Sequence, residues 1–197
     1  MRVGLTGGVG SGATQAAKRL EAKGVAVVSG DAAGHIALTF PEIQNSLRER
    51  FGQRIFTPTG EIDRLTLGEI VFAENEALKE LNRIVHPVLL DILTDEARQL
   101  ELQSGVVVVD AALIYEWGLS GFFHRMIVVE APLEARLQRT MARNGLTEEQ
   151  VLKRMAAQWP LERKIERADF VIHNRGTLEE LYSQVDRVWK TIMEKPT

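Results

Sequence analysis

Apolar positions along this sequence alternate between short continuous runs and longer runs with a helical period. Continuous runs of Val, Ile and Leu are typical of strands buried on both faces of a parallel sheet. Five such runs lie at 2–6, 25–29, 106–110, 126–130 and 170–173. Amphipathic helical spacing occurs at 14–23, 132–143, 147–158 and 178–193. Because strands alternate with helices, the sequence predicts an α/β fold with a doubly wound, five-stranded parallel sheet.

Local signals support several of these helices. Gly24 follows the first and is a helix-ending residue, and Pro132 suits the first turn of another. Thr147 with Gln150 three residues later predicts a capping box. These helix ends therefore agree with the hydrophobic pattern.

Two intervals break the alternation. Residues 30–105 carry no strong strand signal, only helical patterns at 65–72, 76–85 and 88–102, and a simple crossover needs far fewer residues. We predict an inserted helical segment at about 32–104, which either covers a substrate or merely packs. The second interval, 144–167, is rich in Arg, Lys and Glu, and we predict a lid at about 140–167.

Composition narrows the class of protein. With 197 residues, 45% of them hydrophobic, the chain can bury one core, and we expect a single domain over 1–197. A formal net charge of −3 provides no broad basic field, so we expect no nucleic-acid partner. Absence of cysteine favours a cytoplasmic location. No apolar run is long enough for a membrane span, so we expect no membrane partner. We also expect a monomer or a weak homo-oligomer.

Glycines gather between the first strand and the first helix, in the stretch GLTGGVGSGATQ at 4–15. Gly7, Gly12 and Thr14 have the spacing of a Walker A phosphate-binding loop. Glycine allows successive backbone N–H groups to turn toward an anion, and the following helix directs its positive end to the same place. A tight turn without a ligand is the alternative. The lysine of the Walker pattern is absent, because Ala13 occupies its position.

Several stretches together resemble the dephospho-CoA kinase family. They are GLTGGVGSG, the Asp31 after the second strand, VHP at 85–87, VVVVDAALIYEWGL at 106–119, RTMARNGLTEEQVLKRMAAQ at 139–158 and ADFVIHNRGTLEEL at 168–181. The loop alone is generic to nucleotide-binding proteins, whereas its combination with the other motifs is specific. The resemblance implies a P-loop NTPase-like five-stranded parallel sheet flanked by helices, with an inserted helical CoA-binding subdomain and a lid.

The same resemblance implies transfer of the γ-phosphoryl group of ATP to the 3′-hydroxyl of dephospho-CoA, the final step of coenzyme A biosynthesis, with Mg²⁺. Asp31 corresponds to the candidate base beside that hydroxyl; a helix-capping role is its alternative. Asp110 ends its strand as a Walker B aspartate does, and with Thr14 it would hold Mg²⁺. The predicted nucleotide-binding residues are Gly8, Gly10, Ser11, Gly12, Ala13, Thr14 and Gln15. The predicted substrate-binding residues are Asp31, His86, Asp110, Leu113 and Glu116.

Three arginines, Arg136, Arg139 and Arg143, recur at helical spacing on one helix face. Such a face is either a solvated surface or a phosphate-binding one. In the family, the positions of Arg139 and Arg143 approach the nucleotide, so we predict that both are catalytic, with Arg154 a weaker candidate. Tyr115 and Trp117 either line the acceptor pocket or pack in the core.

Four positions depart from the family pattern, which has lysine at Ala13, a hydroxyl residue at Gln15, aspartate at Ser29 and proline at Ala112. Phosphoryl transfer depends on positioning and charge neutralisation, and loss of one preorganised donor lowers rates by about 10²–10³. Lys18 lies a turn further along the helix, and we therefore expect an arginine of the lid to replace the missing cation.

Three functions are compatible with these residues. The first is a working dephospho-CoA kinase, which the retained Asp31, Thr14, Asp110 and lid arginines favour. The second is an impaired or inactive paralogue that binds a nucleotide or CoA-like ligand, which Ala13 favours. The third is a kinase for another small acceptor, because residues 40–65 are less recognisable than the rest.

Overall fold

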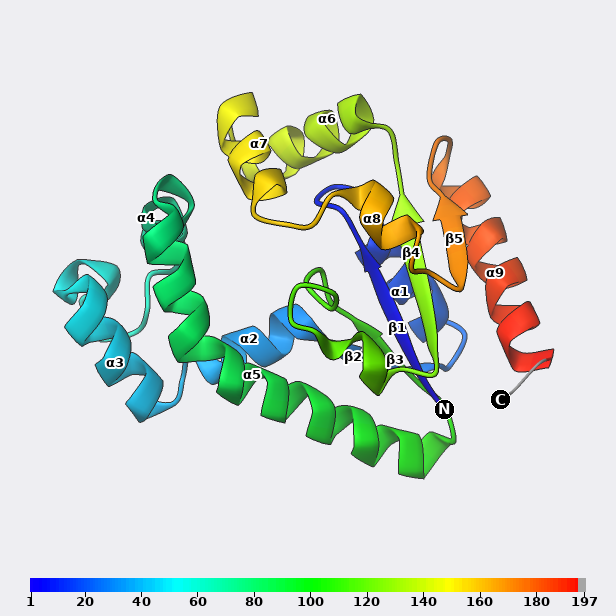
Figure 1. Ribbon diagram of the computed structural model, residues 1–197, viewed down its shortest axis with the longest axis horizontal. Coiled ribbons are helices and arrows are strands. Elements are labelled where there is room, and N and C mark those ends of the chain that lie inside the picture. The colour runs from blue at the N-terminus through cyan, green and yellow to red at the C-terminus, as the bar shows by residue number, and fades with distance from the viewer. Residues whose placement is uncertain (195–197) are drawn as a thin grey trace. The chain divides into compact units, whose positions relative to one another are not determined.

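A five-stranded sheet forms the centre of the computed structural model, which describes residues 1–194 (Figure 1). The strands are β1 (Arg2–Gly7), β2 (Ala26–Ser29), β3 (Val107–Asp110), β4 (Arg125–Glu130) and β5 (Phe170–His173). All neighbours are parallel, in the order β2-β3-β1-β4-β5. Parallel neighbours require crossover connections, which the helices supply. The predicted α/β fold with a five-stranded parallel sheet is confirmed.

Helices make up much of the rest of the described chain. They are α1 (Ala13–Glu21), α2 (Gly30–Ala37), α3 (Pro41–Phe51), α4 (Arg64–Ala73), α5 (Asn75–Ser104), α6 (Leu133–Asn144), α7 (Glu148–Ala156), α8 (Leu161–Ile165) and α9 (Leu178–Glu194), with 3₁₀ turns η1 (Gln53–Ile55) and η2 (Leu119–Phe122). Helices α1, α8 and α9 contact the strands. Thr147 and Gln150 form the predicted capping box at the start of α7.

The chain divides into two compact units, Met1–Ser29 together with 96–194, and Gly30–Asp95. The first unit, which we call the sheet unit, holds all five strands. The second, which we call the helical unit, holds α2, α3, α4 and the first part of α5. The insertion predicted at about 32–104 overlaps the helical unit, and its role in covering a substrate stays a prediction.

In the sheet unit, one core cluster joins the strands to α1 and α9. Alternation along β1 puts Val3 and Leu5 in this cluster, and both side chains are fully buried. The helices contribute Ala16, Ala17, Leu20, Leu181, Val185, Trp189 and Ile192. Figure 1 shows α9 beside β5, the edge strand. This packing fixes the position of α1, which begins where the glycine-rich loop ends.

In the helical unit, the sequence predictions need two corrections. The sequence analysis did not predict α2 or α3, although Pro41 at the start of α3 and buried Ile43 and Leu47 are ordinary helix signals. It also gave two separate helical patterns, at 76–85 and 88–102, whereas α5 is one helix that continues through Pro87. Proline removes one helical hydrogen bond, but burial of Val85 and Leu89 on either side supports a continuous helix.

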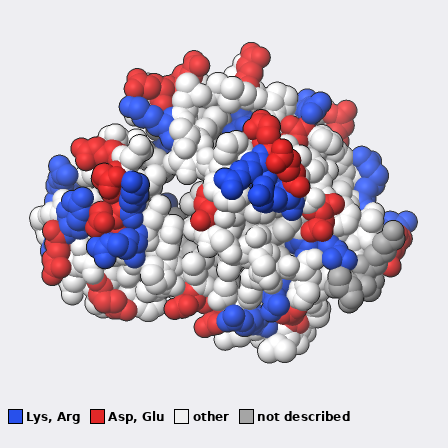
Figure 2. Space-filling view, in the orientation of Figure 1, with Lys and Arg blue, Asp and Glu red and all other residues white. Residues whose placement is uncertain are grey.

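The surface mixes both signs of charge. Figure 2 shows Lys and Arg interspersed with Asp and Glu over the visible face, in agreement with the small net charge of −3. Over residues 1–194, no helix combines the length and the apolar character that a membrane crossing requires.

Candidate active site

The glycine-rich loop runs from the end of β1 at Gly7 to the start of α1 at Ala13. Gly10 and Gly12 have φ angles of +76° and +98°, in the left-handed region that disfavours residues with a side chain. Gly12 is the N-cap of α1, and no side chain caps this helix. The first turn of α1 therefore presents backbone N–H groups at its positive end, which is the arrangement that binds phosphate.

Three side chains from different elements hold this loop. Arg136 Nε of α6 donates a hydrogen bond to Val9 O at 3.0 Å, and Gln158 Oε1 accepts one from Val9 N at 3.1 Å. Asn174 Nδ2, just after β5, donates to Ser11 O at 2.8 Å. The sequence analysis assigned none of these three residues to the site. Gln158 and Asn174 lie within stretches that resemble the family, which is the signal that could have identified them.

Three loop glycines lie so close to neighbouring groups that an added Cβ would force one of those groups to shift. A Cβ on Gly8 would lie 2.6 Å from Arg136 Nη2, and one on Gly12 would collide with Asn174 Nδ2. Gly10 likewise approaches the main chain of α6, because a Cβ there would lie 2.5 Å from Arg136 O. The glycine spacing thus serves tertiary packing as well as anion binding.

The predicted magnesium ligands lie at the same end of the sheet. Asp110 is the last residue of β3 and pairs in register with Leu5 of β1 and Ser29 of β2. Thr14 is exposed on the first turn of α1. A hydroxyl and a carboxylate are hard oxygen donors, and Mg²⁺ is usually held by one or two such groups together with substrate phosphates. The residues present therefore fit Mg²⁺ bound with a nucleotide.

Asp31 and His86 belong to the helical unit. Asp31 is exposed in the first turn of α2, two residues after β2 ends. His86 is half-buried on α5, and burial lowers its pKa. Their predicted roles toward the acceptor stay predictions.

A buried ion pair organises the segment after β3. Lys164 of α8 is fully buried, and its Nζ lies 2.8 Å from Glu116 Oε1 and 2.8 Å from Ala112 O. Glu116 Oε1 also accepts a hydrogen bond from Trp159 N at 2.7 Å. Burial lowers the pKa of Lys164, while the hydrogen bond with Glu116 raises it. Sequence reasoning did not single out Lys164, because charged residues surround it in the chain.

Aromatic packing adds to this segment. Tyr115 is buried and its ring stacks on Trp159 with a centroid distance of 6.0 Å. Burial raises the pKa of Tyr115 to about 12. Leu113 is half-buried in the same segment, and the predicted substrate contacts of Leu113 and Glu116 stay predictions.

The arginines of α6 and α7 differ in environment. Arg136 is half-buried against the loop, whereas Arg139 and Arg143, one and two helical turns later, are exposed on α6. In Figure 1, α6 and α7 lie together at the end of the sheet to which β1 and β4 point. Burial and the nearby positive charge of Arg143 both lower the pKa of Arg154 on α7. Like charges gathered in this way favour binding of an anion between them.

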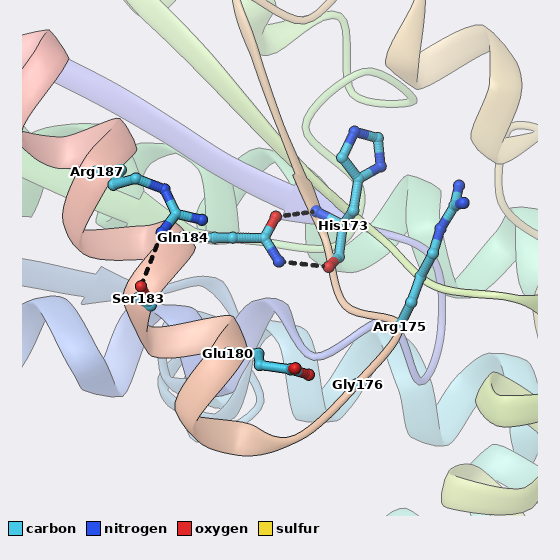
Figure 3. Close-up of a pocket in the computed structure, with 7 residues that line it drawn as sticks. All are labelled: His173, Arg175, Gly176, Glu180, Ser183, Gln184 and Arg187. Atoms are coloured by element: carbon cyan, nitrogen blue, oxygen red, sulfur yellow. Dashed lines mark hydrogen bonds between the residues drawn. The ribbon is translucent and has the colours of Figure 1, made fainter.

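A polar pocket of about 430 Å³ lies beside the end of β5 (Figure 3). Gln184 of α9 uses its amide to pair with both main-chain groups of His173, at 3.0 and 2.7 Å. These bonds satisfy the edge of the outermost strand, where unpaired main-chain groups would otherwise be exposed. Gln184 therefore has a structural role in the wall of this pocket.

The comparisons with known proteins agree with this geometry. A sequence profile described as dephospho-CoA kinase matches residues 1–180. A dephospho-CoA kinase from Thermobifida fusca is 38% identical over 197 residues, which cover 99% of this chain and 98% of that protein. The chain belongs to the dephospho-CoA kinase family. The resemblance noted in the sequence is thereby confirmed.

Two solved structures share the fold of this chain over almost its whole length. A dephospho-CoA kinase from Campylobacter jejuni superposes with a TM-score of 0.73 at 25% identity, covering 98% of this chain and 97% of that one. A protein from Thermus thermophilus gives a TM-score of 0.78 at 35% identity, covering 100% of this chain and 98% of its own. Family membership thus extends over the sheet and the inserted helices.

Proposed function

We propose that this chain is a dephospho-CoA kinase, which transfers the γ-phosphoryl group of ATP to the 3′-hydroxyl of dephospho-CoA. One observation supports this proposal above the others: in a chain that belongs to this kinase family, the glycine-rich loop leads into α1 and no side chain caps the start of that helix. Backbone N–H groups of the loop would bind the phosphates of ATP. The transferred group would then lie beside the predicted magnesium ligands.

Thr14 and Asp110 would hold Mg²⁺, the first through its hydroxyl and the second through its carboxylate. When bound, the ion would supply positive charge that offsets the negative charge developing on the transferring phosphate. Proximity of Asp110 to β1 through the sheet register supports this assignment. ATP and dephospho-CoA are the proposed partners.

Asp31 would accept the proton of the 3′-hydroxyl as its oxygen attacks the γ-phosphorus. Its place just beyond the carboxyl end of β2 supports this role, because ligands bind at that edge of parallel sheets. Arg139 and Arg143 would contact the transferring phosphate from the lid, since their exposed guanidinium groups can bind phosphate oxygens in pairs. His86, Leu113 and Glu116 would contact the acceptor.

The direct test is to incubate the protein with MgATP and dephospho-CoA and to follow CoA by mass spectrometry. We expect one CoA for each ADP. Asp31→Asn should lower kcat by about 10²–10⁴ with little change in the KM for ATP, because only proton transfer is affected. Bound ATP without CoA formation would contradict the proposal, as would preference for another small alcohol over dephospho-CoA.

A cytoplasmic location and a monomeric or weakly associated state are further predictions of this proposal. Sedimentation at several protein concentrations would test the second.

A further inference from the structure

The phosphate loop has no cation of its own. In Walker A loops a lysine at the start of the helix reaches the β- and γ-phosphates, and here that residue is Ala13. Lys18 is exposed five residues further along α1, more than one turn from the loop. If the chain is a kinase, as proposed above, the charge on the transferring phosphate must be neutralised from another element.

Arg136 is the cation that the fold brings to this loop. Its Nε is bonded to Val9 O at 3.0 Å, and its Nη2 and Cζ lie 2.6 and 2.8 Å from where a Cβ on Gly8 would be. The backbone of Arg136 is fixed as well, because its carbonyl accepts a bond of 2.7 Å from Thr140 Oγ1. The guanidinium is therefore held against the loop before any ligand binds.

Arg136 keeps its positive charge, and its guanidinium uses only one of its three nitrogens for a hydrogen bond within the described residues. Burial lowers its pKa, and the carboxylates of Glu162 and Glu130 raise it in part. A guanidinium nevertheless stays protonated near neutral pH. Within residues 1–194, Nε is the only nitrogen of the Arg136 guanidinium with a hydrogen-bond partner. Both Nη groups can therefore donate to phosphate oxygens.

We infer that Arg136 supplies to the bound triphosphate the positive charge that Ala13 lacks. This inference rests on the proposed function for its substrate. Arginine suits the role because its planar fork can anchor one nitrogen on Val9 O while the others bind oxygen. The expectation from the sequence was a lid arginine, and Arg136 lies on the same helix face, one turn before Arg139.

A double-mutant cycle tests this inference. The four proteins are the native chain, Ala13→Lys, Arg136→Gln and the double variant, with kcat/KM for MgATP and the Kd for ATP without dephospho-CoA as readouts. In the native background, Arg136→Gln should lower kcat/KM by about 10²–10³ and weaken ATP binding about tenfold. In the Ala13→Lys background the same change should cost less than about fivefold, because lysine then supplies the charge.

Two further variants complete the test. Arg136→Lys keeps a charge without the fork and should retain more ATP affinity than Arg136→Gln. Arg187→Gln removes an exposed arginine on α9 that is bonded to Ser183, and should change neither readout. Melting temperatures of all variants check that each is folded.

Equal losses in the two backgrounds would show that Arg136 is only a structural anchor and would overturn the inference. It would also be overturned if the Arg136→Lys variant bound ATP no better than the Arg136→Gln variant. If no variant forms CoA while ATP binding still shows the coupling between positions 13 and 136, the proposed function fails and this inference stands.

Discussion

Replacement of Lys164 by methionine should destabilise the sheet unit strongly. The Lys164 side chain is fully buried, and only 13% of the Glu116 side chain is exposed. Methionine has a similar length and is flexible, so it should fill most of the space that lysine leaves. The main consequence is therefore a buried Glu116 carboxylate that has lost its counter-charge.

Removal of one partner from a buried ion pair costs about 3–5 kcal/mol. For a chain of this size, 1 kcal/mol changes the melting temperature by about 2–4 °C. We therefore expect Lys164→Met to lower the melting temperature by roughly 6–20 °C, if it folds. Part of this loss should return in the double variant Lys164→Met with Glu116→Gln, because a neutral amide is less costly to bury than an unpaired carboxylate.

Circular dichroism during thermal and urea unfolding measures this effect. The matched control is Lys153→Met, which removes an exposed lysine paired with Glu149 on α7. It should cost no more than about 0.5 kcal/mol. If Lys164→Met is no worse than this control, or if the added Glu116→Gln recovers nothing, the reasoning from a buried, uncompensated carboxylate is wrong.

Two other predictions concern the loop and acid stability. Gly12→Ala should lower the free energy of unfolding by about 2–4 kcal/mol and weaken ATP binding, because alanine strains the left-handed backbone and displaces the Asn174 amide from Ser11 O. The control Gly24→Ala, where φ is +82° and the space is open, should show only the backbone strain, about 1–2 kcal/mol. Calorimetric unfolding and ATP-binding measurements on both variants check this. The Arg19 guanidinium, bonded to both carboxylate oxygens at 2.9 and 2.6 Å, helps to lower the pKa of Asp186 to about 2. The resulting stabilisation, about 1 kcal/mol for this partly exposed pair, should be complete above about pH 4 and lost as the pH falls toward 2. In Asp186→Asn, the free energy of unfolding should not show this loss between about pH 4 and 2.

Strand positions were predictable because each strand is a short run of mostly apolar residues, and β1, β3 and β4 are buried along almost their whole length. Val107–Asp110 and Phe170–His173 therefore read as short apolar runs whatever their neighbours are. The capping box at Thr147 was also predictable, since both of its hydrogen bonds are local. Helix α3 was missed although its buried Ile43, Leu47 and Phe51 recur at helical spacing, because polar and charged residues fill most of the rest of the segment.

The sequence by itself determined the family, the strand positions and the glycine loop, because these depend on local conformation and on motifs of fixed spacing. Tertiary structure decided which charged residues are buried and which meet the loop. Arg136 and Val9 are 127 positions apart, and Lys164 and Ala112 are 52 apart. Nothing in the chain around Arg136 distinguishes it from the exposed Arg139. The difference between the two arginines comes from the packing of α6 over Gly8 and Gly10. Arg136 can lie against the loop backbone there because these two residues have no Cβ.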